Sequence, residues 1–212
     1  MSNETNLHWE ILDKKRLELL PKLSVFKNRF YLAGGTALAL YLGHRDSIDF
    51  DFFIPNKFDH QSLIREIKKT FEKSEVKEII NQPNTVLLEI DGISASFFFY
   101  EYPLLEPLLQ TEYLNIASLA DIGCMKLEAI LGRYRLKDYV DLYAICKTMP
   151  LKGLLEKAKD KFPIYNLGAF VRALGYYEDI EMDKIIFKND FYVGVKTIEE
   201  FFKNEIKKLF NL

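Results

Sequence analysis

The chain has 212 residues, of which 49% are hydrophobic and 28% are charged. These proportions are typical of a folded globular protein, and they exclude a disordered chain and a bundle of membrane-spanning helices. The 29 basic and 31 acidic residues give a formal net charge of −2, so the molecule as a whole has no positive field that would attract nucleic acid.

Three features favour a cytoplasmic protein without a membrane segment. Residues 1–6 are polar and lack the basic start and apolar stretch of a secretory signal. The longest uncharged stretch of the first half, residues 31–43, is shorter than the ~20 residues that a spanning helix needs. Cys124 and Cys146 both lie in apolar helical patterns, which favours two reduced core thiols.

Helical and strand-like segments alternate up to Tyr113, and almost every later segment has helical periodicity. Asp91-Gly92 separates two β-rich segments and is a strong hairpin signal. The elements expected in the first half are a leading helix over 7–25 interrupted at Pro21, a strand over 30–33, a helix capped by Thr36, a strand over 48–54, a helix over 59–73, and strands over 85–90 and 93–100. Helices are expected over 119–131, 137–147, 151–161, 167–176 and 195–209. The pattern predicts an α+β protein, with a mixed β-sheet core over 1–112 and a helical domain over 113–212 that closes over a cleft.

The strand over 48–54 carries the first candidate site. Its residues alternate, with Ile48, Phe50 and Phe52 on one face and Asp49 and Asp51 on the other. Two carboxylates placed two residues apart on a strand point the same way, close enough to share a hard cation such as Mg²⁺. Taken alone, the pair is weak evidence for a metal site, and a solvated strand face is its simpler interpretation.

Gly34-Gly35-Thr36 supplies the second candidate feature. A glycine turn that leads into a helix presents free backbone N–H groups and a positive dipole end to a phosphate group. An ordinary tight turn is the simpler interpretation of two adjacent glycines. Together with the acidic strand, however, the turn would place a phosphate site beside a metal site, as metal-assisted nucleotide chemistry requires.

These residues resemble the AbiEii/AbiGii toxin family of the nucleotidyltransferase superfamily. The resemblance rests on residues 32–38 (LAGGTAL), 43–53 (GHRDSIDFDFF) and a later block that comprises 125–130 (MKLEAI), Arg133 and 137–143 (KDYVDLY). It implies a nucleotidyltransferase-like sheet and a toxin role in a type IV toxin–antitoxin or phage-defence system. Some relatives, the MenT toxins, add nucleotides to the 3′ end of transfer RNA.

The resemblance also implies roles for individual residues. Asp49 and Asp51 would hold Mg²⁺ or Mn²⁺. The residues implied in binding the nucleoside triphosphate are Gly34, Gly35, Thr36, His44, Arg45 and Ser47. The wider superfamily usually carries a third carboxylate on a later strand, where this chain offers Ser94 and Ser96. One metal or two therefore both remain possible.

The later block also has a physical interpretation. Lys126 and Arg133 share a helix face and would present two cations to a nucleotide. Asp138 or Asp141 would either orient Lys126 or accept a proton from the attacking hydroxyl group. An interhelical salt-bridge network is the alternative for these carboxylates.

The residues and the resemblance together predict an enzyme that transfers a nucleoside monophosphate to an acceptor. The resemblance implies that this acceptor is the 3′ end of a transfer RNA or another RNA, and that a cognate antitoxin protein is the partner. Three alternatives stay open: a regulator that binds a nucleoside triphosphate without transferring it, a module that only docks an antitoxin, and transfer to a protein side chain.

Overall fold

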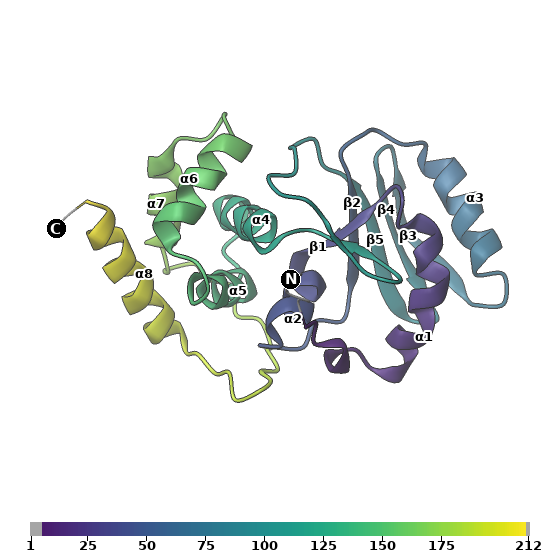
Figure 1. Ribbon diagram of the computed structural model, residues 1–212, viewed down its shortest axis with the longest axis horizontal. Coiled ribbons are helices and arrows are strands. Elements are labelled where there is room, and N and C mark those ends of the chain that lie inside the picture. Colours follow the sequence, from purple (N-terminus) through teal and green to yellow (C-terminus); the bar gives the residue numbers. More distant parts are fainter. Residues whose placement is uncertain (1–5, 211–212) are drawn as a thin grey trace, which may run out of the picture.

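The computed structural model describes residues 6–210, so most of the polar amino-terminal stretch lies outside the described residues. A central sheet has helices on both faces, and the later part of the chain forms a helical half beside it (Figure 1). In chain order the elements are α1 (Lys14–Leu23), β1 (Tyr31–Ala33), α2 (Gly34–Leu42), β2 (Phe50–Ile54), α3 (His60–Thr70), β3 (Val76–Gln82), β4 (Thr85–Ile90), β5 (Ile93–Phe99), β6 (Leu109–Gln110), β7 (Asn115–Ile116), α4 (Leu119–Gly132), α5 (Leu136–Cys146), α6 (Leu151–Lys161), α7 (Leu167–Leu174) and α8 (Val195–Leu209).

The strands form one mixed sheet in the order β3-β4-β5-β2-β1-β7-β6. At its centre β2 pairs with β1 in antiparallel register and with β5 in parallel register. Helices α1 and α3 cover one face of the sheet, and α2 and the helical half lie on the other (Figure 1). The predicted α+β class, with a mixed sheet and a helical second half, is confirmed.

The alternation of β2 determines which face carries chemistry. Phe50 and Phe52 are buried on the side of α1, where Phe52 stacks on Phe97 at 5.0 Å and Phe97 contacts Phe26 edge-on at 5.5 Å. Asp51 therefore points to the opposite face, toward the helical half. The predicted alternation is confirmed for these positions, whereas Ile48 is 55% exposed and not part of the core.

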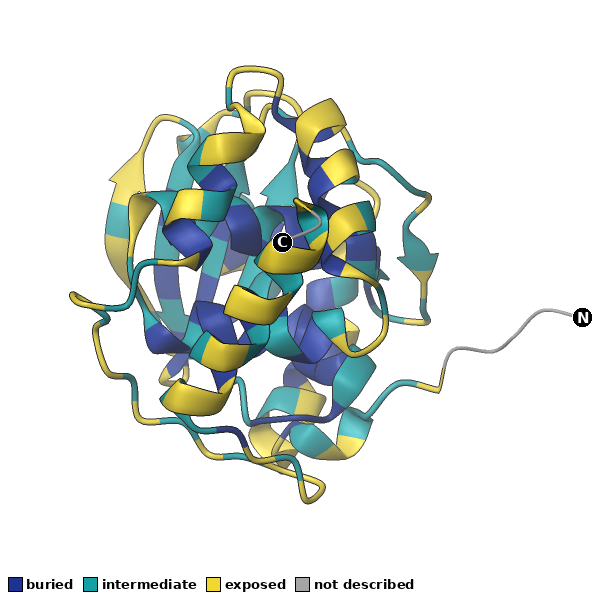
Figure 2. Ribbon diagram, turned by 90° about the vertical axis from the view of Figure 1, so that its left-hand side faces the viewer, coloured by how far each residue is buried: buried dark blue, intermediate teal, exposed yellow. Residues whose placement is uncertain are grey.

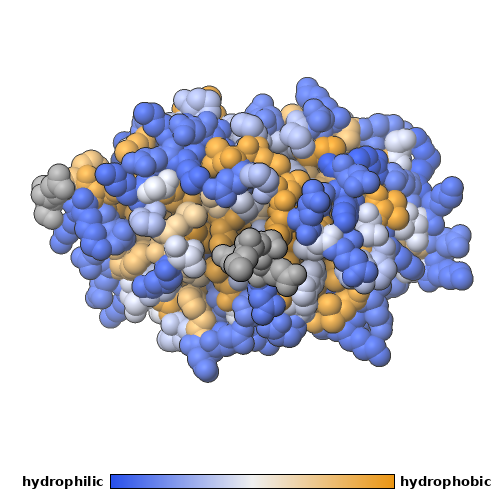
Figure 3. All heavy atoms as spheres, in the orientation of Figure 1, coloured by the Kyte–Doolittle hydropathy of each residue, from blue (hydrophilic) through white to orange (hydrophobic). Residues whose placement is uncertain are grey.

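One cluster of buried side chains runs through both halves, from Leu12 to Phe202. Figure 2 shows these buried residues between the layers, with exposed residues on the outer helix faces. In Figure 3 hydrophilic residues dominate both ends of one face, and apolar residues gather in its middle, between the sheet and the helical half. Within residues 6–210, no helix has the length and apolar character to cross a bilayer.

Several local features differ from the sequence-based expectations. Helix α1 runs through Pro21 and ends at Leu23, followed by a 3₁₀ turn. Helix α2 begins at Gly34, so Thr36 lies inside it and is not the N-cap. The strands β3, β6 and β7 were not expected, and the 112/113 boundary falls between β6 and β7, which pair with each other.

Candidate active site

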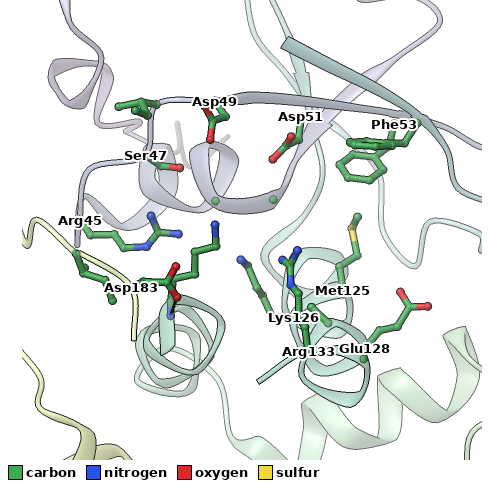
Figure 4. Close-up of a pocket in the computed structure, with 18 of the residues that line it drawn as sticks. Arg45, Ser47, Asp49, Asp51, Phe53, Met125, Lys126, Glu128, Arg133 and Asp183 are labelled. Atoms are coloured by element: carbon green, nitrogen blue, oxygen red, sulfur yellow. Dashed lines mark hydrogen bonds between the residues drawn. The ribbon is translucent and has the colours of Figure 1, made fainter. Parts of the chain in front are cut away.

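A cavity of about 980 Å³ separates the acidic face of the sheet from the helical half. Asp49 and Asp51 line one wall, and both side chains point into the space that Arg45, Lys126 and Arg133 border from the opposite side (Figure 4). The acidic residues come from β2 and the loop before it, Lys126 comes from α4, and Arg133 directly follows α4. Sheet and helices thus bring together residues that lie more than seventy positions apart in the sequence.

The Gly34-Gly35 turn closes the cavity beside the acidic pair. Gly34 has a φ of +71°, and a Cβ there would lie 2.9 Å from Oδ2 of Asp51. A Cβ on Gly35 would lie 2.7 Å from Oγ of Ser47 and 2.8 Å from Nη2 of Arg45. The two glycines therefore leave room against the backbone at the first turn of α2, whose N–H groups have no acceptor within the helix.

Thr36 connects this turn to the acidic strand from behind. Its hydroxyl group donates to the carbonyl oxygen of Asp49 at 2.5 Å and lies 3.0 Å from Oγ of Ser47. The side chain is buried and does not line the cavity. Thr36 consequently holds Asp49 and Ser47 in position. It was expected to contact the nucleotide directly, but its side chain lies outside the cavity.

The basic side of the cavity rests on two buried carboxylates. Nζ of Lys126 lies 2.8 Å from Asp138 and 2.7 Å from Asp141. Arg45 donates two hydrogen bonds to Asp141, at 2.6 and 2.7 Å, and Arg133 donates to Asp138 at 2.9 Å. These three cations and two carboxylates carry a formal excess of one positive charge on the side that faces the acidic pair.

Burial and the neighbouring cations act in opposite directions on these carboxylates. Burial by itself would raise the pKa of Asp141, but Lys126 and Arg45 hold that pKa well below its ordinary value. The same balance, with Lys126 and Arg133 as the cations, lowers the pKa of Asp138. A carboxylate with a lowered pKa is a poor proton acceptor, so the geometry favours the orienting role for both carboxylates over that of a general base.

Asp51 lies in the opposite situation. Burial raises its pKa, the charge of Asp49 raises it further, and Lys126 lowers it in part. Two ionised carboxylates that share a cavity wall repel each other unless a cation lies between them. Mg²⁺ is usually held by one or two carboxylates together with substrate phosphates and water, so this donor set fits such an ion.

Ser96 occupies the place beside this pair. In the parallel register of β2 and β5, Asp51 lies opposite Ser96, one of the two serines named above at the expected place of a third carboxylate. In the described part of the chain, no group of three or more His, Cys, Asp or Glu side chains gathers at a candidate metal site. Asp49 and Asp51 are therefore the two carboxylates that this part of the sheet offers to a metal ion.

Most predicted site residues line the cavity. Those that do are Gly34, Gly35, Arg45, Ser47, Asp49, Asp51, Lys126 and Arg133. His44, Asp138 and Asp141 are buried outside it, and Nε2 of His44 lies 2.9 Å from Asp141. His44 therefore reaches the site through Asp141 and Arg45, and not through a phosphate contact of its own.

Residues 183–186 form a wall that the sequence did not predict. The acidic composition of residues 178–183 is typical of a solvated loop, but Asp183 accepts hydrogen bonds from Arg135 and from the backbone N–H of Lys137. The backbone N–H of Asp46 donates to Ile186 at 2.8 Å, which ties this segment to the motif loop. Nothing local in the sequence marks these residues, because long-range backbone contacts determine their position.

Comparison with known proteins agrees with this geometry. The family model for the nucleotidyl transferase AbiEii toxin of type IV toxin–antitoxin systems matches residues 18–191. The uncharacterized protein aq_aa25 of Aquifex aeolicus is 38% identical over 205 residues, which cover 93% of this chain and 97% of that protein.

Two solved structures share the fold at low sequence identity. MenT4, a nucleotidyltransferase toxin of Mycobacterium tuberculosis, has a TM-score of 0.60 at 18% identity, covering 92% of this chain and 82% of its own. JHP933 of Helicobacter pylori has a TM-score of 0.54 at 17% identity, covering 97% and 95%. The family match and the arrangement of the glycine turn and the acidic strand lead to one conclusion: the chain belongs to the AbiEii family of nucleotidyltransferase toxins.

Proposed function

We propose that this protein transfers a nucleoside monophosphate from a Mg²⁺-bound nucleoside triphosphate to a hydroxyl group of an RNA acceptor, such as the 3′ end of a transfer RNA. The observation that carries the proposal is the pairing of Asp49 and Asp51 with three cations across one cavity beside the Gly34-Gly35 turn. We also propose that it acts as the toxin of a type IV system and that a cognate antitoxin restrains it.

The triphosphate would bind along the glycine turn. The N–H groups at the start of α2 and the guanidinium group of Arg45 would face its phosphate oxygens, with Ser47 beside them. Because Arg45 also donates to Asp141, its guanidinium group is held in one orientation before the nucleotide arrives. Such preorganisation avoids the entropic cost of ordering a long side chain during binding.

Asp49 and Asp51 would hold the metal ion. When bound, Mg²⁺ would polarise the α-phosphate and offset the mutual repulsion of the two carboxylates. Lys126, fixed between Asp138 and Asp141, would neutralise charge that develops on the phosphate oxygens. In this scheme Asp138 and Asp141 position Lys126, Arg45 and Arg133 and do not contact the reacting atoms.

The test measures transfer of a labelled nucleotide to RNA. The protein is incubated with Mg²⁺, each α-labelled nucleoside triphosphate and total RNA, and the labelled polymer is identified on a denaturing gel. Asp49→Asn and Asp51→Asn should fold normally and lose at least a hundredfold in transfer rate, whereas Glu89→Gln, a carboxylate of β4 outside the cavity, should retain it. Full transfer by both aspartate variants would refute the proposal.

The serine at the third-carboxylate position favours a second candidate, a regulator that binds a nucleoside triphosphate without transferring it. That candidate predicts Mg²⁺-dependent nucleotide binding that Asp49→Asn weakens, with neither release of pyrophosphate nor labelling of any polymer. Label on protein instead of RNA would identify a side chain as the acceptor.

A further inference from the structure

The cavity has an apolar end that the proposed phosphate and metal contacts do not use. Asp51 and Phe53 alternate along β2, which directly follows Asp49, so the wall that carries the acidic pair continues into an aromatic surface. Phe53 lies 5.4 Å from Phe98 and 5.7 Å from Tyr100 between ring centroids. The residues that line this end are Phe53, Phe98, Tyr100, Met125, Glu128 and Tyr165.

A single carboxylate lies among these apolar side chains. Oε2 of Glu128 accepts a hydrogen bond of 2.8 Å from the phenol group of Tyr100. Burial raises the pKa of Glu128, and burial together with Glu128 itself raises the pKa of Tyr100, so the phenol remains a donor. Tyr100 thereby fixes one carboxylate oxygen, and no described side chain donates to the other.

Glu128 differs in this respect from the carboxylates on the basic side of the cavity. No ion pair within residues 6–210 includes it, and Lys161, the cation that acts on its pKa, is bound to Asp121 at 2.8 Å. Because its pKa is raised in the folded state, its favourable contribution is complete below pH ~4.5 and is lost as pH rises through the folded pKa. A carboxyl group whose pKa is raised by burial makes no favourable contribution to folding once it is ionised, which indicates a role other than stability.

The order of groups along the cavity indicates which part of the substrates lies at this end. In Figure 4 Arg45 and Ser47 lie at one end, the acidic pair lies in the middle, and Phe53, Met125 and Glu128 lie at the other. In phosphoryl transfer the attacking and leaving oxygens are roughly in line on opposite sides of phosphorus. If pyrophosphate leaves toward Gly35 and Arg45, the acceptor approaches from the aromatic end.

We propose that the aromatic end, with Tyr100 and Glu128, is an acceptor subsite that binds the terminal nucleobase of an RNA through an amino group of that base. The inference rests on the proposed function and specifies how its acceptor is selected. Aromatic side chains stack on the flat face of an unpaired base, and a carboxylate accepts a hydrogen bond from an amino group at its edge.

This chemistry discriminates between bases of similar size. Cytosine presents an N4 amino group, which donates to a carboxylate, whereas uracil presents an O4 carbonyl at the same position, which Glu128 would repel. The preference should therefore favour a terminal cytosine or adenine over uracil, by about tenfold for one well-placed hydrogen bond. Stacking alone would bind both pyrimidines equally, so the carboxylate supplies the discrimination.

The experiment measures binding as well as transfer, so that it does not depend on turnover. The probes are two fluorescein-labelled hexaribonucleotides that differ only in a 3′-terminal cytidine or uridine, titrated with the full chain in the presence of Mg²⁺. We expect the wild-type protein to bind the cytidine-ended probe about tenfold more tightly. Glu128→Gln should reduce that ratio to within threefold, because the amide accepts or donates depending on its orientation while Tyr100 still has an acceptor.

Two controls separate this role from others. Glu101→Gln removes the same charge from an exposed residue next to Tyr100 that does not line the cavity, and it should leave the ratio unchanged. Thermal unfolding of Glu128→Gln at pH 7 should show an equal or higher midpoint, with a gain that shrinks as pH falls toward 4.5. A purely structural role for Glu128 would lower the midpoint instead.

The outcomes distinguish the inference from the proposed function. Equal binding of both probes by the wild-type protein, or a ratio that Glu128→Gln does not change, would overturn the inference even if RNA is labelled. If Glu128→Gln alters the preference for CTP over UTP and not that for the probes, the subsite takes the donor base and the acceptor assignment is wrong. Failure of transfer with every nucleotide, together with selective probe binding, would count against the proposed function alone.

Discussion

Gly34→Ala tests the glycine turn at the point where backbone conformation and chemistry meet. Gly34 has a φ of +71°, a left-handed conformation that costs an alanine about 1–2 kcal/mol. The added Cβ would also lie 2.9 Å from Oδ2 of Asp51, which is too close for the carboxylate to keep its position. Gly34 is the first residue of α2 and directly follows β1, so the chain has little freedom to relax away from Asp51.

Together these effects should lower the free energy of unfolding by about 2 kcal/mol. For a chain of this length the melting temperature should fall by about 4–8 °C. Displacement of Asp51 should reduce transfer by more than the stability loss explains, because a small misplacement of a catalytic group carries a large rate penalty.

The assay combines thermal unfolding by circular dichroism with the RNA-labelling reaction, run well below both melting temperatures. Gly153→Ala is the matched control, because a Cβ there meets no atom within 4 Å and the residue lies inside α6. It should raise stability by about 0.5–1 kcal/mol and leave transfer unchanged. If Gly34→Ala melts with the wild-type protein and transfers at the wild-type rate, the described fit between Gly34 and Asp51 is incorrect.

Three further predictions concern buried charge and the second glycine. Asp141→Asn should lower the free energy of unfolding by about 3–5 kcal/mol in urea titrations, because it leaves two buried cations short of an anion; a loss below 0.5 kcal/mol would contradict the network. The pKa of Asp141 in the folded state is lowered beside Lys126, Arg45 and His44. The difference in unfolding free energy between wild type and this variant should therefore be constant above pH ~5 and shrink as pH falls below ~4. If it shrinks between pH 8 and 6 instead, a group other than Asp141 is responsible. Gly35→Ala should weaken Mg²⁺-dependent nucleotide binding about tenfold in calorimetric titrations, because its Cβ would lie 2.8 Å from the guanidinium group that Asp141 holds in place; unaltered affinity would argue against phosphate contact with this turn.

The sequence predicted elements well where local chemistry determines them. Asp91 and Gly92 both adopt positive φ, as the two-residue hairpin between β4 and β5 requires. Strand β3 escaped prediction because a register shift between Glu78 and Ile80 disrupts its alternation and most of its residues are exposed at the sheet edge. Two residues are thus enough to predict the hairpin turn, whereas the irregular edge strand β3 is recognised only by its pairing with β4.

In the candidate site, too, the sequence predicted what local spacing determines and missed what the fold determines. Asp49 and Asp51 were predicted because two-residue periodicity fixes their common direction. The contact of Lys126 with Asp138 and Asp141 followed in part from helical spacing, but the choice between orienting role and proton acceptance required the burial that only the fold supplies. Glu128 lies in the block 125–130 that resembles the family. Its aromatic neighbours come from the sheet, so the helical pattern around Glu128 could not predict them.

The wall formed by residues 183–186 determines how late in synthesis the cavity can be completed. A polypeptide emerges from the ribosome in order, and this segment is made after the glycine turn, the acidic strand and Lys126. Until it docks through Asp46 and the N–H of Lys188, which donates to His44, the nascent molecule holds its reactive groups in an incomplete enclosure. The cavity is therefore complete only after the carboxy-terminal part of the chain has been made and has folded against the motif loop.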